Sequence, residues 1–99
     1  MAEALVSIQI IPKTPNGEDS IPYVDEAIQV IEQAGVKYQV HPLETTMEGD
    51  LHQLLNVVEK MNERLHQIGC PSIISQVKIY SRADKQASMT DLTKKYLDD

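Results

Sequence analysis

The sequence contains one cysteine, no basic stripe and no long apolar run, and each absence excludes a class of protein. Cys70 has no second cysteine to pair with and no CxxC or histidine neighbour at metal-ligand spacing, so we interpret it as a buried thiol in a reducing compartment. No apolar run approaches the roughly 20 residues of a membrane span, and the N-terminus lacks the basic segment that opens a signal peptide. We therefore expect a cytosolic protein with no membrane partner.

The overall charge argues against nucleic acid as a partner. The chain has 9 basic and 15 acidic residues, a net charge of −6 and a pI near 4.9. Such a surface repels a phosphate backbone, which proteins bind through clustered lysine and arginine. The length of 99 residues and the hydrophobic content of 41% suit one small core. We expect residues 1–99 to form a single domain.

Four segments have the alternating pattern of strands, and two have the three- and four-residue spacing of amphipathic helices. We expect strands at residues 4–11, 36–40, 42–49 and 72–80, with Pro12 ending the first. The first helix is predicted to begin after Ser20 as N-cap and to end at Gly35. The predicted core stripe of the second helix is Leu51, Leu54, Leu55, Val58, Met61, Leu65 and Ile68. Residues 90–97 could add a short helix that either packs on a partner or frays.

The order β-α-β-β-α-β predicts an α+β, ferredoxin-like fold, in which two helices cover one face of a four-stranded antiparallel sheet. The other face is left uncovered. The side chains predicted to lie on it are Ser7, Gln9, Lys37, Gln39, His41, Gln76 and Lys78, together with the apolar Leu5, Ile11, Ile74 and Tyr80. A second copy of the chain would cover this apolar surface, so we predict a homo-oligomer formed by sheet faces or edges. The alternative is a monomer with a partly apolar surface.

Several residues that often carry chemistry have plainer interpretations in this chain. His41, His52 and His66 have neither HxxxH spacing nor a serine or cysteine partner, so we expect no metal site and no nucleophilic triad. The pair Asn16-Gly17 lacks the remaining glycines of a dinucleotide-binding loop, and we interpret it as a turn.

The segment PLETTMEGD, residues 42–50, concentrates two hydroxyls and a carboxylate between a strand and a helix. One interpretation is local capping, in which Thr46 or Glu48 bonds to the turn and Asp50 caps the helix. The other is a recognition edge, where hydroxyls and a carboxylate orient a small heteroaromatic ligand and carbon surface supplies affinity. A carboxylate suits a ring that presents an amino group and a ring N–H. The sequence leaves both interpretations open.

Together with other short motifs, this segment resembles the family of small thiamine-binding proteins, also described as UPF0045. The residues that carry the resemblance are Pro12, Ser20, Tyr23 and Val24, AGVKY at 34–38, HP at 41–42, TTMEG at 45–49, Gly69, Lys78 and RAD at 82–84. The resemblance implies a ferredoxin-like domain that assembles into dimers and tetramers. It also implies that the protein binds thiamine or its hydroxymethylpyrimidine half without transforming it. The chain departs from the family at Asn62, where relatives often have histidine, and at Pro71 and Ser72, where they have a basic residue.

The leading hypothesis is therefore a non-enzymatic binding protein whose ligand is thiamine or a hydroxymethylpyrimidine compound, with no cofactor and no metal. Thr45, Thr46 and Glu48 are expected to orient the ring, and Ser7 or Gln9 is expected to complete the polar set from the neighbouring strand. The alternative is a structural or regulatory homodimer or homotetramer module with no small-molecule ligand. An enzyme that uses Glu48 as general base lacks a partner acid or nucleophile in the sequence.

Overall fold

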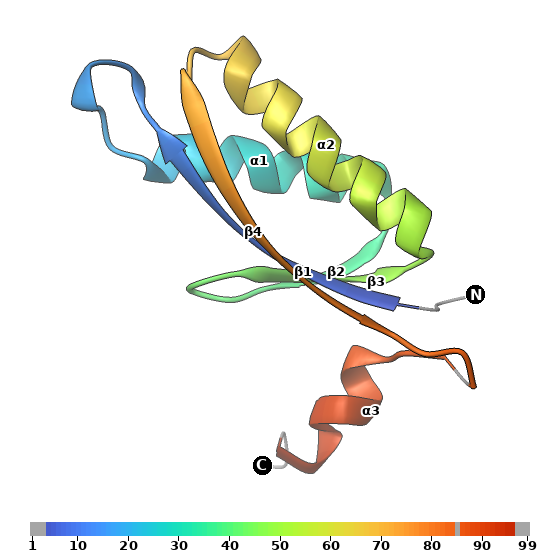
Figure 1. Cartoon of the computed structure of the whole chain (residues 1–99). Coiled ribbons are helices and arrows are strands. Elements are labelled where there is room, and N and C mark those ends of the chain that lie inside the picture. Colours follow the sequence, from blue (N-terminus) through green and yellow to red (C-terminus); the bar gives the residue numbers. More distant parts are fainter. Residues whose placement is uncertain (1–3, 85, 97–99) are drawn as a thin grey trace.

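The computed structural model describes residues 4–84 and 86–96, and the elements in these residues confirm the predicted βαββαβ order. The strands β1 (Ala4–Lys13), β2 (Lys37–Val40), β3 (Thr45–Gly49) and β4 (Ser72–Ser81) form an antiparallel sheet in the order β2-β3-β1-β4. The helices α1 (Ile21–Ala34) and α2 (Leu51–Gln67) cover one face of this sheet (Figure 1). The short α3 (Met89–Thr93) lies on the other face, followed by one 3-10 turn, Lys94–Tyr96. The predicted ferredoxin-like fold is confirmed.

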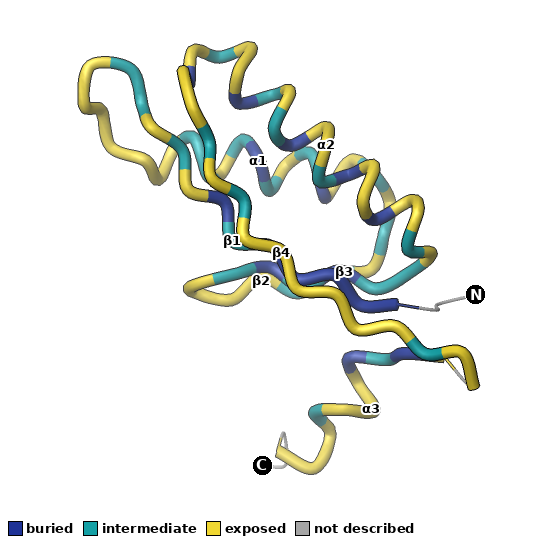
Figure 2. The backbone as a smooth tube through the Cα atoms, in the orientation of Figure 1, coloured by how far each residue is buried: buried dark blue, intermediate teal, exposed yellow. Residues whose placement is uncertain are grey.

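The core lies between the sheet and the two long helices. Val6, Ile8 and Ile10 alternate along β1 and are buried against α1 and α2, as Figure 2 shows for the centre of that strand. The buried residues of α2 are Leu54, Val57, Met61 and Leu65. The prediction for Leu55 was wrong, because its side chain is 40% exposed. Consecutive helical residues are rotated by about 100°, so the helix turns Leu55 away when Leu54 faces the sheet.

The ends of the elements are set by local hydrogen bonds. Asp50 is the N-cap of α2, and its Oδ2 accepts from the amide of Gln53 at 3.1 Å. Gly35 ends α1 in the left-handed conformation with φ of 76°, which glycine adopts without a Cβ clash. Ser20 is the N-cap of α1, as predicted, but its side chain makes no capping bond. Ser20 already has helical backbone angles, and Asp19 Oδ1 instead accepts from the amide of Ile21 at 3.1 Å.

The first strand continues past the proline that was predicted to end it. β1 pairs with β4 as far as Lys13, whereas its pairing with β3 stops at Ile8. Beyond Ile8, β1 pairs with β4 on one side only. Proline has no N–H to donate, and a strand with one unpaired side accommodates Pro12 without losing a hydrogen bond of the sheet. The extended β1 gives β4 a partner along its whole length.

Asn62, one of the departures from the family pattern, links α2 to β4. Its side-chain amide donates to the carbonyl oxygen of Val58 and to Ser75 Oγ, both at 3.0 Å. The second bond joins the helix layer to the strand at the edge of the sheet. In this chain the position therefore holds β4 against α2.

The segment that ends the described chain packs on its own sheet. Ala87 and Met89 bury their side chains against Leu5 of β1. Ser88 caps α3, because its Oγ accepts from the amide of Asp91 at 3.2 Å. Leu92 and Tyr96 stay 47% and 73% exposed. The expected short helix thus begins at Met89 and docks on β1, and position 97 of the prediction lies outside the described residues.

Candidate functional site

We call the sheet face opposite α1 and α2 the free face, and its centre is a line of polar side chains. The strand register pairs Gln39 of β2 with Thr46 of β3, Thr46 with Ser7 of β1, and Ser7 with Lys78 of β4. These four residues, Gln39, Thr46, Ser7 and Lys78, form what we call the polar row. It crosses all four strands because directly opposed residues in antiparallel pairs point to the same side of a sheet.

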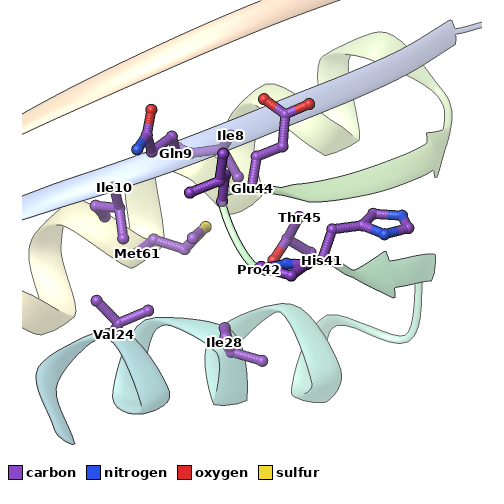
Figure 3. Close-up of a pocket in the computed structure, with 11 residues that line it drawn as sticks. Ile8, Gln9, Ile10, Val24, Ile28, His41, Pro42, Glu44, Thr45 and Met61 are labelled. Carbon is purple, nitrogen blue, oxygen red and sulfur yellow. The ribbon is translucent and has the colours of Figure 1, made fainter. Parts of the chain in front are cut away.

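Glu44, from the hairpin that joins β2 to β3, adds a negative charge to the polar row. Its Oε1 lies 3.0 Å from Lys78 Nζ, and Figure 3 shows its carboxylate directed away from α1. The Lys78 ammonium, and then the Ser7 hydroxyl, hold the pKa of the Glu44 carboxyl below its ordinary value. Glu44 is therefore ionised at neutral pH and contributes a fixed negative charge to the free face.

The two hydroxyls of the polar row are only loosely engaged with each other. Thr46 Oγ1 donates to Ser7 Oγ at 3.4 Å, which is long for a bond between hydroxyl groups. A weak bond of this kind is readily exchanged for one to a ligand. Both hydroxyls thus retain hydrogen-bonding capacity toward a molecule placed on the free face.

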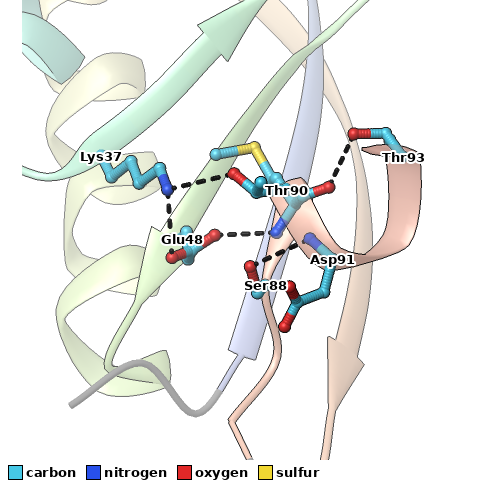
Figure 4. Close-up of polar contacts among 7 residues, drawn as sticks. Lys37, Glu48, Ser88, Thr90, Asp91 and Thr93 are labelled. Atoms are coloured by element: carbon cyan, nitrogen blue, oxygen red, sulfur yellow. Dashed lines mark hydrogen bonds and ion pairs between the residues drawn. The ribbon is translucent and has the colours of Figure 1, made fainter. Parts of the chain in front are cut away.

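Glu48 holds α3 against the sheet. Its Oε1 accepts from the amide of Met89 at 2.8 Å, and its Oε2 lies 3.8 Å from Lys37 Nζ (Figure 4). Lys37 Nζ also donates to Thr90 Oγ1 at 3.5 Å. The Glu48 side chain is 12% exposed, so both carboxylate oxygens are engaged by protein groups. The carboxylate expected to read a ligand instead anchors the start of a helix.

A cleft of about 210 Å³ opens between the free face and α3. The residues that line it are Leu5, Gln39, His41, Thr46, Met89, Leu92 and Thr93. Carbon surface comes from both sides, because Leu5 belongs to the sheet and Met89 and Leu92 to the helix. The hydroxyl of Thr46, the amide of Gln39 and the ring of His41 supply the polar groups. An apolar cleft with a few convergent polar groups is the usual form of a small-molecule site.

The residues expected at the site do not all lie together. Thr46, Ser7 and Glu48 lie on the free face, and Gln9 lies one row further along β1, opposite Gln76. Thr45 does not join them, because it pairs with Ile8 and therefore faces the helices. A strand turns successive side chains to opposite faces, so Thr45 and Thr46 serve different sides of the sheet.

Sequence reasoning placed Gln39 and His41 on this face but left them out of the expected ligand set, and it missed Glu44. Glu44 was not singled out, although it stands in the quoted segment, because the hairpin geometry that turns it toward Lys78 involves residues 34 positions apart in the chain. The usable signal was the short gap between β2 and β3, closed by a bond from the His41 amide to the Glu44 carbonyl at 2.9 Å. A gap of that length predicts a tight hairpin whose residues stay at the sheet edge.

Residues 4–84 and 86–96 offer neither a metal-binding cluster nor a membrane-spanning helix. In that part of the chain, no group of three or more His, Cys, Asp or Glu side chains is placed to hold a metal ion. Burial raises the pKa of the Cys70 thiol, and this keeps the sulfur protonated at neutral pH. Nor does any helix in the described ranges combine the length and apolar character needed to cross a bilayer.

Comparison with known proteins gives relatives along nearly the whole chain. The model of the thiamine-binding protein family matches residues 6–97. A UPF0045 protein of Clostridium perfringens is 47% identical over 76 residues, which cover 75% of this chain and 77% of that protein. A second UPF0045 protein, from Staphylococcus xylosus, is 30% identical over 103 residues and covers 97% of this chain and 96% of its own.

Two solved structures have the same fold. A DUF77 domain from Bacillus cereus has a TM-score of 0.90 and 32% sequence identity, and the match covers 98% of this chain and 93% of that one. A Thermotoga maritima protein, named for a relation to thiamine biosynthesis or salvage, has a TM-score of 0.82 and 27% identity, with coverage of 95% and 98%. The resemblance carried by the TTMEG segment and its flanking motifs is confirmed, and the chain belongs to the thiamine-binding protein family.

Proposed function

We propose that this protein binds thiamine or its hydroxymethylpyrimidine half, without converting it, in the cleft between the free face and α3. The observation that carries the proposal is the polar row, whose hydroxyls and amide lie beside a cleft walled by Leu5, Met89 and Leu92. Membership of the thiamine-binding protein family supports the choice of ligand. A flat pyrimidine ring between the sheet and the helix would lose water from both of its faces, and Thr46 and Gln39 would fix its orientation.

In this proposal Glu44 takes the role that the sequence suggested for Glu48. The thiazolium ring of thiamine carries a positive charge, and the ionised Glu44 is the carboxylate that contributes charge to the polar row. Glu48 acts one step away from the ligand, because it bonds to the Met89 amide and so positions the helix that closes the cleft. Glu44 is then a ligand-binding residue and Glu48 a positioning residue.

Calorimetric titration of wild type and Glu44→Gln with thiamine and with hydroxymethylpyrimidine tests the proposal. We expect wild type to bind both compounds and Glu44→Gln to bind thiamine about tenfold more weakly, since a partly exposed charged partner is lost. The loss should be smaller for hydroxymethylpyrimidine, which lacks the positive ring. Glu59→Gln, on the exposed side of α2, is the matched control. No binding of either compound by wild type would refute the proposal.

We further propose that the cytoplasmic form is a homodimer or homotetramer in which copies meet at β4. This strand is at the edge of the sheet, and it exposes Val77 and Ile79 on the helix side and Ile74 and Tyr80 on the free face. A ten-residue edge strand with apolar side chains on both faces is a template for pairing with a second chain. Pairing of two β4 strands would continue the sheet and cover these side chains.

The same edge strand supports a second candidate, an oligomerisation module that has no small-molecule ligand. A thermal-shift experiment separates the two. A ligand at 100 times its dissociation constant stabilises the folded state by about 2.7 kcal/mol, so thiamine at saturating concentration should raise the Tm by several degrees. An unchanged Tm with thiamine and with hydroxymethylpyrimidine would favour the module.

A further inference from the structure

A second cavity lies on the opposite side of the sheet from the free-face cleft. It has a volume of about 160 Å³ and opens between α1 and the hairpin at residues 41–44 (Figure 3). Its inner lining is apolar, from Ile8, Ile10, Val24, Ile28 and Met61. The hairpin residues form its outer rim, where Leu43 is 76% exposed. We call it the hairpin pocket.

One polar side chain faces this apolar space. Thr45 is only 5% exposed, and it lines the hairpin pocket on the helix side of β3. Within residues 4–84 and 86–96 its hydroxyl makes no hydrogen bond, and no fully buried side-chain oxygen or nitrogen lacks a partner, so the Thr45 hydroxyl oxygen is open to the pocket. A hydroxyl that opens into an apolar cavity is available to a molecule bound there. The hydroxyl is therefore a hydrogen-bonding group that the fold leaves unused.

The main chain of β1 adds further polar groups at the same place. Pairing between β1 and β3 stops at Ile8, opposite Thr45, while pairing between β1 and β4 continues to Lys13. On the β3 side, the β1 main chain from Gln9 onward has no strand partner in the described part of the chain. Both Gln9 and Ile10 line the hairpin pocket. Main-chain groups and one hydroxyl thus converge on a space whose walls are otherwise carbon.

We propose that the hairpin pocket is a second small-molecule site, which binds a neutral, flat, single-ring compound carrying one hydroxyl or ring nitrogen. A cavity of roughly 150 Å³ accommodates a benzene-sized ring, and the hairpin pocket is of that size. We expect the compound to be neutral, because Glu44, the acidic residue of the lining, pairs its carboxylate with Lys78 on the free face. The ring fills the apolar lining and its polar atom bonds to Thr45.

Methyl NMR with phenol as the probe tests this site, and benzene serves as the comparison compound. Saturable shifts of the Ile28 and Met61 methyl signals are expected with phenol, because both residues line the hairpin pocket and neither lines the free-face cleft. His41 lines both cavities and is therefore not a useful reporter. Benzene is expected to bind several-fold more weakly than phenol, because it cannot bond to the Thr45 hydroxyl.

Substitutions at two adjacent threonines supply the control. Thr45→Val should weaken phenol binding about 3- to 10-fold, the cost of one hydrogen bond, and leave benzene binding unchanged. Thr45→Ser should restore phenol binding, and Thr46→Val, on the other face, should not affect it. The proposal is overturned if phenol gives no saturable shift at Ile28 and Met61, if Thr45→Val binds phenol like wild type, or if thiamine displaces phenol. Failure of thiamine to bind at all would refute the proposed function and leave this site standing.

Discussion

Thr45 and Thr46 are consecutive residues of β3, yet Thr45 faces α1 and Thr46 faces the cleft beneath α3. Thr45 pairs with Ile8 of β1, and both residues are buried on the helix side. Thr46 pairs with Ser7, which also carries a hydroxyl. The free face therefore has one of the two hydroxyls that the sequence offered, and the helix side has the other. Because the two hydroxyls lie on opposite faces, a threonine-to-valine substitution at Thr45 tests the hairpin pocket and the same change at Thr46 tests the cleft.

The affinity for thiamine should depend on Thr46 and not on Thr45. Thr46→Val removes a hydroxyl from the cleft while keeping the shape of the side chain, and we expect thiamine affinity to fall about 3- to 10-fold. Thr45→Val should leave the affinity within twofold of wild type, because its side chain lies on the far side of the sheet. Calorimetry on the two variants measures both values. A larger loss for Thr45→Val would reverse the assignment of the two faces.

Glu48 should control how firmly α3 stays on the sheet. Glu48→Ala removes the acceptor for the Met89 amide and the partner of Lys37, and a hydrogen bond to a charged group contributes about 1.5–3 kcal/mol. We expect the Met89 amide to exchange with solvent at least tenfold faster in NMR measurements. Glu63→Ala, on the exposed side of α2, serves as the matched control. Equal exchange of the Met89 amide in wild type and Glu48→Ala would show that Ala87 and Met89 hold the segment by packing alone.

The charge of Glu44 gives the fold a defined pH dependence. Its pKa lies below the ordinary value of 4.5, chiefly because of Lys78. A carboxyl with a depressed folded pKa stabilises the fold above the unfolded pKa, and this contribution is lost as the pH falls through the folded pKa. Lys78→Gln should raise the Glu44 pKa toward 4.5, as followed by NMR titration of the carboxyl carbon. The control Lys60→Gln, on α2, should not move it, and an unmoved titration in Lys78→Gln would exclude Lys78 as the cause.

Assembly through β4 should be sensitive to charge at the edge strand. Ile79 is 50% exposed on the helix side of β4, and lysine at that position would place charge where a second copy is proposed to pack. We expect Ile79→Lys to reduce the molar mass in light scattering to that of one chain. Leu43→Lys, at the exposed hairpin, should keep the mass of wild type. A wild-type protein that is monomeric at micromolar concentration would rule out this interface.

The register of α2 gives a comparison of two adjacent leucines. Leu54 is fully buried, whereas Leu55 is 40% exposed. Leu54→Ala should lower the free energy of unfolding by about 2–5 kcal/mol, the usual cost of truncating a buried leucine, while Leu55→Ala should cost less than about 1 kcal/mol. Urea denaturation measures both. Similar costs would mean that Leu55 is buried in an assembly of chains.

The layout of the sheet was predictable from the sequence because strand alternation assigns each residue to a face. Ser7, Gln39 and Lys78 were all expected on the uncovered face, and the register brings them into one line. Capping by Asp50 was equally local, since the bond spans three residues. Periodicity and short-range hydrogen bonds act within a few residues, and a single sequence contains that information.

The partners of the two glutamates could not be predicted in the same way. Glu48 bonds to Met89, 41 residues later, and nothing in the local pattern indicates that the chain returns to this strand. Glu44 meets Lys78 across two strands of the sheet. Sequence reasoning also grouped Thr45 with Thr46 because they are adjacent, although alternation alone sends them to opposite faces. Tertiary contacts thus decide which groups each carboxylate meets.

The most direct test of the central claim, that the free face is the ligand-binding surface, is a crystal structure of the protein grown with saturating thiamine. We predict density for the pyrimidine ring between β3 and α3, in contact with Thr46 and Gln39, with the thiazolium turned toward Glu44. Density confined to the hairpin pocket beside Thr45, or a crystal in which the cleft holds only water at full thiamine saturation, would contradict the account.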